Sequence, residues 1–232
     1  SRSARWLDLV ASEAFTAPWG VRMIPRDDPA YEPTSYHGGA VWPLYTGWVS
    51  WAEYTAGRAA AGAAHWRQNI ALGFARERGA WDEVLHGDEL RAAGVCPDQA
   101  WSTAMVVSPF VSGMLGFVPS VHRGRIRLRP QLPAEWDSIS VERLRVAGAA
   151  LAFRYERVGD IHRFTVRVEG RDEALRLRLE PALAVPNVRD VRLDGEAVAF
   201  TTRRFGDRVL VSVTCPLRPD TLRTLDVAGE TR

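Results

Sequence analysis

The chain of 232 residues is predicted to be an α+β protein of two domains, with helices in residues 1–119 and strands in residues 120–232. Apolar residues recur at helical spacing up to Pro119, and after it they alternate with polar residues. The aromatic content changes near the same place, because eight of the nine tryptophans lie at or before Trp101. A chain of this length accommodates two small domains.

The charge of the chain is also divided. Residues 1–120 contain 9 arginines and 12 acidic residues, a net charge of −3, whereas residues 121–232 contain 21 arginines and 16 acidic residues, a net charge of +5. The net charge of the whole chain is +2, which argues against a protein dedicated to nucleic-acid binding. No apolar run reaches the about 18 residues of a membrane-spanning helix, so we expect no membrane partner.

The two cysteines, Cys96 and Cys215, fall in different domains and have no partners at metal-ligand spacing. We therefore expect no zinc site, no disulfide framework and no cofactor. A reducing compartment fits two isolated cysteines, and the expected location is the cytoplasm.

The first domain is expected to combine four helices with two long loops. Pro43 suits the first turn of a helix, Gly57 a helix end, and Asp98 an N-cap, while Pro109 predicts a kink. Both long loops contain aromatic and charged residues, and long loops inside compact domains tend to be functional. The expected helices are 3–16, 41–57, 58–77 and 98–116, and the expected loops are 17–40 and 80–97.

The second domain is expected to be an antiparallel β-sandwich. Its short alternating segments have one apolar and one polar face, and Gly- and Asp-containing turns separate them. Most of its 21 arginines occupy the polar face, which we interpret as a solvated surface rather than a binding patch. The expected strands are 125–129, 139–146, 150–155, 164–168, 174–179, 191–193, 198–201 and 209–213.

The first loop ends in the segment Tyr36-His-Gly-Gly-Ala-Val-Trp-Pro43, which leads into a helix. Aromatic rings beside a histidine can form the wall of a sugar pocket, because ring faces stack on the apolar faces of sugars. The alternative is structural: Tyr36 and Trp42 would then be core residues, and His37 would bond to the helix end.

The second loop contains four carboxylates within eight residues, which are candidates for general acid or base catalysis. Close like charges raise one another's pKa, so at most one or two of the four can act. The alternative is that all of them are solvated surface groups. The four are Asp82, Glu83, Asp88 and Glu89.

Taken in order, these loops resemble glycoside hydrolases of the amylo-α-1,6-glucosidase (glycogen-debranching) type, which fold as six-hairpin (α/α)6 barrels. The resemblance covers residues 15–119. It rests on Gly20-Val-Arg-Met-Ile, Asp28-Pro-Ala-Tyr31, Tyr36-His-Gly-Gly-Ala-Val-Trp-Pro43, Glu83…Gly87-Asp88 and Cys96-Pro-Asp-Gln-Ala-Trp-Ser102.

The resemblance implies that residues 1–119 are the C-terminal part of such a barrel, followed by the β-sandwich. It also implies an inverting hydrolase of an α-glucosidic bond in a glucan or oligosaccharide, with Glu83 as the general base that activates water. Inversion needs two carboxyl groups about 6.5–9.5 Å apart, and the general acid is expected in a segment upstream of this chain. The residues implied around the sugar are Tyr36, His37, Trp42, Gln99 and Trp101.

A partial barrel is expected to expose apolar helix faces, which the upstream half of the enzyme or a second copy would cover. Three other functions remain open: a related rhamnosidase- or trehalase-like hydrolase, a disaccharide phosphorylase in which phosphate replaces the activated water, and a non-catalytic carbohydrate-binding protein.

Overall fold

The computed structural model describes residues 2–94, 96–146, 148–170 and 173–230. The chain divides into two compact units, Ser1–Met114 and Leu115–Arg232, which we name the helical unit and the strand unit. The division falls five residues before the boundary at 119/120 expected from the sequence. Each unit is described by itself.

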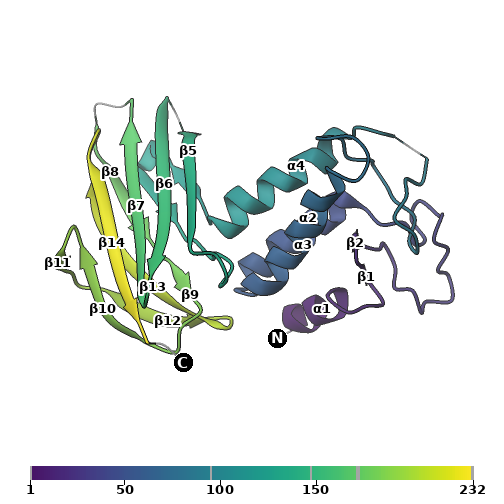
Figure 1. Cartoon of the computed structure of the whole chain (residues 1–232), viewed down its shortest axis with the longest axis horizontal. Helices are drawn as coiled ribbons and strands as arrows, with labels where there is room; N and C mark the ends of the chain where they lie inside the picture. Colours follow the sequence, from purple (N-terminus) through teal and green to yellow (C-terminus); the bar gives the residue numbers. More distant parts are fainter. Residues whose placement is uncertain (1, 95, 147, 171–172, 231–232) are drawn as a thin grey trace. The chain divides into compact units, whose positions relative to one another are not determined.

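Among its described residues, the helical unit contains four short α-helices and a small β-ribbon (Figure 1). A π-helical turn at Pro109–Met114 continues the last helix. The elements are α1 (Arg2–Val10), β1 (Thr16–Ala17), β2 (Gly20–Val21), α2 (Pro43–Thr55), α3 (Ala59–Leu72) and α4 (Ala100–Ser108).

Small residues allow the helices to pack closely on α2. A Cβ atom at Gly47 would lie 2.3 Å from Cβ of Met105 in α4, and one at Gly62 would lie 2.8 Å from the ring of Tyr54. Tyr54 is fully buried, and Ser50 of α2 donates a hydrogen bond of 2.7 Å to the carbonyl oxygen of Gly62 in α3. These positions therefore favour glycine for close approach rather than for backbone freedom.

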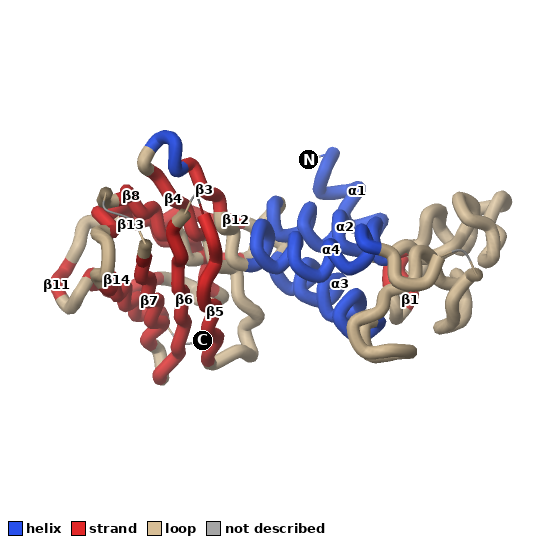
Figure 2. Tube along the Cα trace, turned by 90° about the horizontal axis from the view of Figure 1, so that it is seen from above, coloured by secondary structure: helices blue, strands red, loops and turns tan. Residues whose placement is uncertain are grey.

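The two long loops are joined by backbone hydrogen bonds. Val41 and Leu85 each donate a bond of 2.9 Å to the other's carbonyl oxygen, and further bridges link Val41 to Arg22 and Leu85 to Ala92. The loops gather at one end of the helices (Figures 1 and 2). The packing of Val41 and Leu85 with Ala17 and Leu72 gives this loop layer a core of its own.

The strand unit contains two six-stranded sheets. In the first, with the order β11-β10-β14-β7-β6-β5, every pair is antiparallel. Its strands are β5 (Ser138–Val146), β6 (Ala149–Val158), β7 (Ile161–Glu169), β10 (Val188–Leu193), β11 (Glu196–Ala197) and β14 (Leu222–Gly229).

The second sheet has the order β12-β13-β8-β4-β3, with β9 paired to β13 beside this path. Its central pair, β4 with β8, is parallel, while the others are antiparallel. Its strands are β3 (Val118–Ser120), β4 (Arg125–Leu128), β8 (Leu175–Leu179), β9 (Ala182–Leu183), β12 (Thr201–Phe205) and β13 (Arg208–Leu217).

The expectation of a C-terminal part of an (α/α)6 barrel followed by an antiparallel β-sandwich is wrong. The helical unit has four helices of only 9 to 14 residues, and long loops separate them where a barrel needs paired long helices. The strands lie in three sheets, and one sheet contains a parallel pair. The chain is a mixed α+β protein and does not contain an α/α toroid among its described residues.

Apolar side chains are exposed on α1 and α2, as expected for uncovered helix faces. Trp6, Trp48 and Trp51 are 55%, 52% and 40% exposed, and they line one open hollow. The expectation that an upstream half or a second copy covers them stays a prediction. Among the described residues, no helix is long and apolar enough to cross a membrane.

Candidate functional site

The two loops bring Tyr36 and Glu83 into direct contact. The Tyr36 hydroxyl donates a hydrogen bond of 2.6 Å to Oε1 of Glu83, whose residue is only 6% exposed. The hydrogen bond to Glu83 and then burial raise the pKa of Tyr36 above its usual value of 10.0. The phenol therefore stays protonated at neutral pH and keeps donating to the carboxylate.

The backbone around Glu83 is held on both sides. Its N–H donates a bond of 2.8 Å to the carbonyl oxygen of Cys96, and the next residue, Val84, is buried with Ala40 and Trp42. Trp42 in turn donates from Nε1 to the carbonyl oxygen of Tyr36 at 2.9 Å. The carboxylate and its donor are thus attached to one packed cluster.

Four aromatic rings form a connected wall beside this carboxylate. The Tyr36 ring lies 4.5 Å from Trp42 and 4.7 Å from His37 between centroids, both in edge-on geometry. His37 stacks on Trp42 at 5.8 Å with planes 11° apart, and Trp101 lies 6.3 Å from Trp42. Trp42 is buried at 7% exposure, whereas His37 and Trp101 are exposed residues, Trp101 at 40%.

Gln99 is connected to the loop that carries Glu83 through a backbone hydrogen bond. It is the N-cap of α4, and its N–H donates a bond of 2.8 Å to the carbonyl oxygen of Trp81, two residues before Glu83. This bond holds the start of α4, and therefore Trp101, against the loop with the carboxylate. All six residues predicted for the site are thus brought to one region, although their roles stay predictions.

The four loop carboxylates differ in their surroundings. Asp82 pairs with Arg76 at 3.4 Å, and Glu89 pairs with Arg91 at 2.7 Å on the surface. Asp88 accepts hydrogen bonds and ion pairs from the first loop, as described below. Glu83 is the most buried of the four, and among the described residues its side chain accepts a hydrogen bond from a neutral phenol instead of pairing with an arginine.

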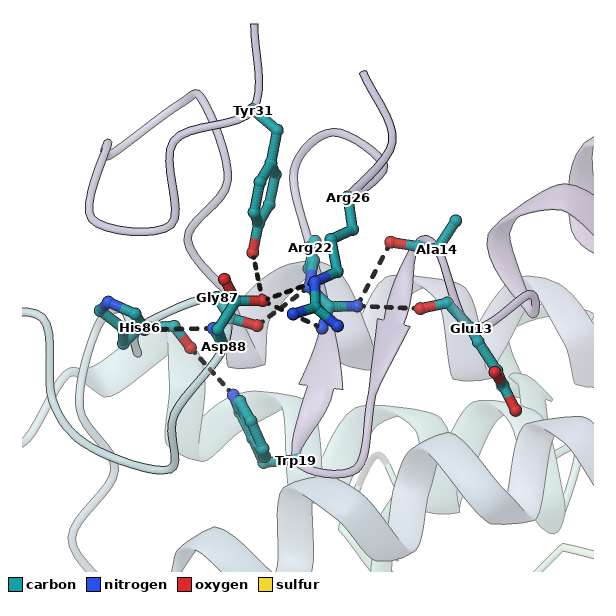
Figure 3. A network of polar contacts seen from close by, with 9 residues as sticks. All are labelled: Glu13, Ala14, Trp19, Arg22, Arg26, Tyr31, His86, Gly87 and Asp88. Carbon is teal, nitrogen blue, oxygen red and sulfur yellow. Dashed lines mark hydrogen bonds and ion pairs between the residues drawn. The ribbon is translucent and has the colours of Figure 1, made fainter. Parts of the chain in front are cut away.

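Asp88 belongs to a network that joins the loops and that the sequence did not reveal (Figure 3). Its Oδ1 accepts a hydrogen bond of 3.0 Å from Tyr31 and lies 3.1 Å from Nε of Arg26 and 3.8 Å from Arg22. Its own N–H donates to Nδ1 of His86 at 3.1 Å. Arg22, Tyr31 and Asp88 all lie in the segments on which the family resemblance rests. Their sequence positions did not indicate that they contact one another.

Arg22 is the buried centre of this network, at 4% exposure. It donates to the carbonyl oxygen of Gly87 at 2.9 Å, and to those of Glu13 and Ala14 at 3.1 and 3.2 Å (Figure 3). One guanidinium therefore binds three backbone carbonyl groups from two segments, residues 13–14 and Gly87, which a planar group with five donors can do. The network positions the loop that carries Glu83 without contacting Glu83 itself.

Within the described ranges, no group of three or more His, Cys, Asp and Glu residues is arranged to hold a metal ion. Cys96 and Cys215 are both free thiols. Comparison of the chain with models of known protein families and with curated proteins finds no match.

Proposed function

We propose that the Glu83 site is the water-activating part of an inverting glycoside hydrolase that cleaves an α-glucosidic bond in a glucan or oligosaccharide. The observation that carries the proposal is the buried Glu83 carboxylate, hydrogen-bonded to Tyr36 beside an aromatic wall of which His37 and Trp101 are exposed. A carboxylate bordered by aromatic faces has the two functions that sugar hydrolysis needs, a base and a stacking surface.

Glu83 acts as the general base. The Tyr36 hydroxyl occupies one position on Oε1, and Oε2 remains to accept a proton from water. As that proton transfers, the water oxygen bonds to the anomeric carbon from the face opposite the leaving group. The bond between the anomeric carbon and the glycosidic oxygen breaks, and a second carboxyl group protonates the departing oxygen. The proposal assigns that acid to no described residue.

The aromatic wall binds and orients the sugar. The exposed rings of His37 and Trp101 stack on the apolar face of a glucosyl ring, while buried Trp42 contacts both rings. Tyr36 is a positioning residue, because its hydroxyl directs the carboxylate rather than contacting the reacting atoms. Gln99 contributes by holding the first turn of α4.

The test uses α-glucosyl fluoride, because fluoride departs as an anion and needs no general acid. The full chain is expected to release fluoride and β-glucose, the inverted product, which proton NMR identifies by its anomeric signal. Glu83→Gln is expected to slow the release roughly a hundredfold or more, since it removes general base catalysis. Asp82→Asn is the matched control, because Asp82 is a neighbouring carboxylate bound to Arg76.

Three outcomes contradict the proposal. Equal rates for Glu83→Gln and the parent chain would remove Glu83 from the reaction. Release of glucose 1-phosphate in phosphate buffer would identify a phosphorylase. Oligosaccharide binding without turnover of the fluoride would identify a non-catalytic carbohydrate-binding protein.

A further inference from the structure

The parallel pairing of β4 with β8 places four arginines on one face of the second sheet. Arg125 lies opposite Arg176, and Arg127 lies opposite Arg178. The alternate residues of both strands, Ile126, Leu128, Leu175, Leu177 and Leu179, are buried on the other face. We call the four arginines the arginine grid; β3, β4 and β8 are labelled in Figure 2.

Arginines directly opposite each other repel, and this arrangement destabilises a sheet. Arg178 alone in the grid pairs with an acid, at 2.8 Å from Glu180, and Arg129 shares that acid. Within the described residues, Arg125, Arg127 and Arg176 form no ion pair. Glu180 acts on both Arg178 and Arg127, so it offsets only part of the charge of the four arginines, and the grid keeps an excess of positive charge.

Ion pairing is frequent but not general among the arginines of the strand unit. Eight described arginines outside the grid each lie within ion-pair distance of a carboxylate, whereas Arg178 is the one member of the grid that does so. The eight are Arg129, Arg154, Arg157, Arg163, Arg167, Arg189, Arg192 and Arg223.

The Nε atom of Arg127 is buried and has no hydrogen-bond partner among the described residues. Burial, followed by the charge of Arg129, lowers the pKa of Arg127. An unpaired buried donor costs free energy, and an anionic acceptor relieves that cost together with the repulsion between arginines. Two open hollows of about 590 and 350 Å³ include Arg125 and Arg176 in their linings and provide room for such an acceptor.

The dimensions of the grid indicate how many anions it holds. Neighbouring strands lie about 4.8 Å apart, and residues i and i+2 of one strand lie about 6.6 Å apart. Two arginines across the strands can bind one phosphate with several charge-assisted hydrogen bonds. The two rows, Arg125 with Arg176 and Arg127 with Arg178, therefore match two phosphates separated along the strand direction.

We propose that the arginine grid binds a small molecule carrying two separate phosphate groups. The hydroxyls of Ser120 and Thr214 belong to the same lining and offer further donors. Both hollows are lined without aromatic rings, so they lack the stacking surface that single-stranded nucleic acid uses. The proposal does not depend on the activity of Glu83, and it goes beyond the interpretation of these arginines as a solvated face, which stays a prediction.

Isothermal titration of the full chain tests the proposal with glucose 1,6-bisphosphate, glucose 6-phosphate and inorganic phosphate at one fixed ionic strength. The bisphosphate is expected to bind at least about tenfold more tightly than either monophosphate, because it uses both rows. Equal affinity for the three probes would overturn the two-phosphate site. Tighter binding of a single-stranded oligonucleotide than of the bisphosphate would overturn it in favour of a nucleic-acid surface.

The double variant Arg125→Gln/Arg176→Gln removes one row. It is expected to lose the preference for the bisphosphate while its own thermal unfolding temperature stays equal or rises, because like-charge repulsion is relieved. The control Arg145→Gln/Arg204→Gln changes the net charge equally on exposed positions of β5 and β12. Loss of the preference in both double variants would reduce the effect to net charge and refute the site.

Discussion

Tyr36 donates a hydrogen bond of 2.6 Å to Glu83 across 47 positions of the sequence. This side-chain contact links the first long loop, residues 17–40, to the second, residues 80–97. It places a protonated phenol beside a nearly buried carboxylate. Because Glu83 accepts the hydrogen bond from the Tyr36 hydroxyl, the pKa of Tyr36 depends on the charge of the side chain at position 83.

Replacing Glu83 by glutamine is expected to lower the pKa of Tyr36 toward its usual value of 10.0. The hydrogen bond to the Glu83 carboxylate is the largest cause of the raised pKa, and a neutral amide stabilises the phenol less. Ultraviolet titration of the phenolate measures the shift, with Tyr36→Phe identifying the signal. An unchanged titration in Glu83→Gln would show that the contact does not persist in solution, whereas Asp82→Asn should leave it unaltered.

Trp101→Ala is expected to weaken oligosaccharide binding roughly tenfold with little loss of stability, because the residue is 40% exposed and the proposal assigns its ring to sugar stacking. Trp48→Ala, with a ring 52% exposed on α2, is the matched control and should leave the affinity unchanged. Titration of tryptophan fluorescence with malto-oligosaccharides measures both. Equal weakening in the two variants would argue against the aromatic wall as the sugar surface.

Asp88→Asn is expected to destabilise the helical unit by about 1–3 kcal/mol, because buried Arg22 loses the negative charge of its network. Glu89→Gln removes only an exposed ion pair with Arg91 and should cost much less stability, because solvent screens that pair. Urea unfolding measures the difference, and hydrogen exchange should show faster exchange of the loop amides near Gly87 in Asp88→Asn. Equal stability of the two variants would contradict a positioning role for the network.

The strand unit is expected to lose stability as the pH falls. Burial, followed by the charges of Arg157 and Arg208, lowers the pKa of His162 from 6.5 to about 4. The unfolded chain therefore takes up a proton between these values while the folded chain does not. The stabilisation is complete above pH 6.5 and is lost as the pH falls toward 4.

By this linkage, the free energy of unfolding should fall by roughly 2 kcal/mol from pH 7 to pH 5 through His162 alone. His162→Gln should reduce the pH dependence by that amount, although loss of the 2.9 Å contact with the Tyr155 hydroxyl lowers stability at both pH values. Urea unfolding at the two pH values measures the slope. An undiminished slope in the variant would exclude His162 as its source.

The sequence-based predictions that are wrong concern features that depend on tertiary packing. A helix expected over 58–77 ends at Leu72, and a Cβ atom at Gly73 would lie only 2.3 Å from the Trp81 ring, which covers that position. The helix expected over 98–116 is α-helical only to Ser108 and continues as a π-helical turn from Pro109, whose missing N–H interrupts the hydrogen-bond ladder. The barrel expected from the motif resemblance is absent, because short motifs indicate the residues of a site and do not determine how many helices surround it.

The sequence by itself determined where helices give way to strands, which strand residues face the core, and which loops gather aromatic and acidic side chains. Alternation assigns Arg125 and Arg176 to polar faces, but it does not say which strands pair, since any pairing that buries the leucines satisfies it. Only the tertiary structure placed those arginines opposite each other, enclosed Arg22 in a network of three segments, and bonded Tyr36 to Glu83. Contacts between distant positions arise from the packing of whole elements, and local periodicity contains no record of them.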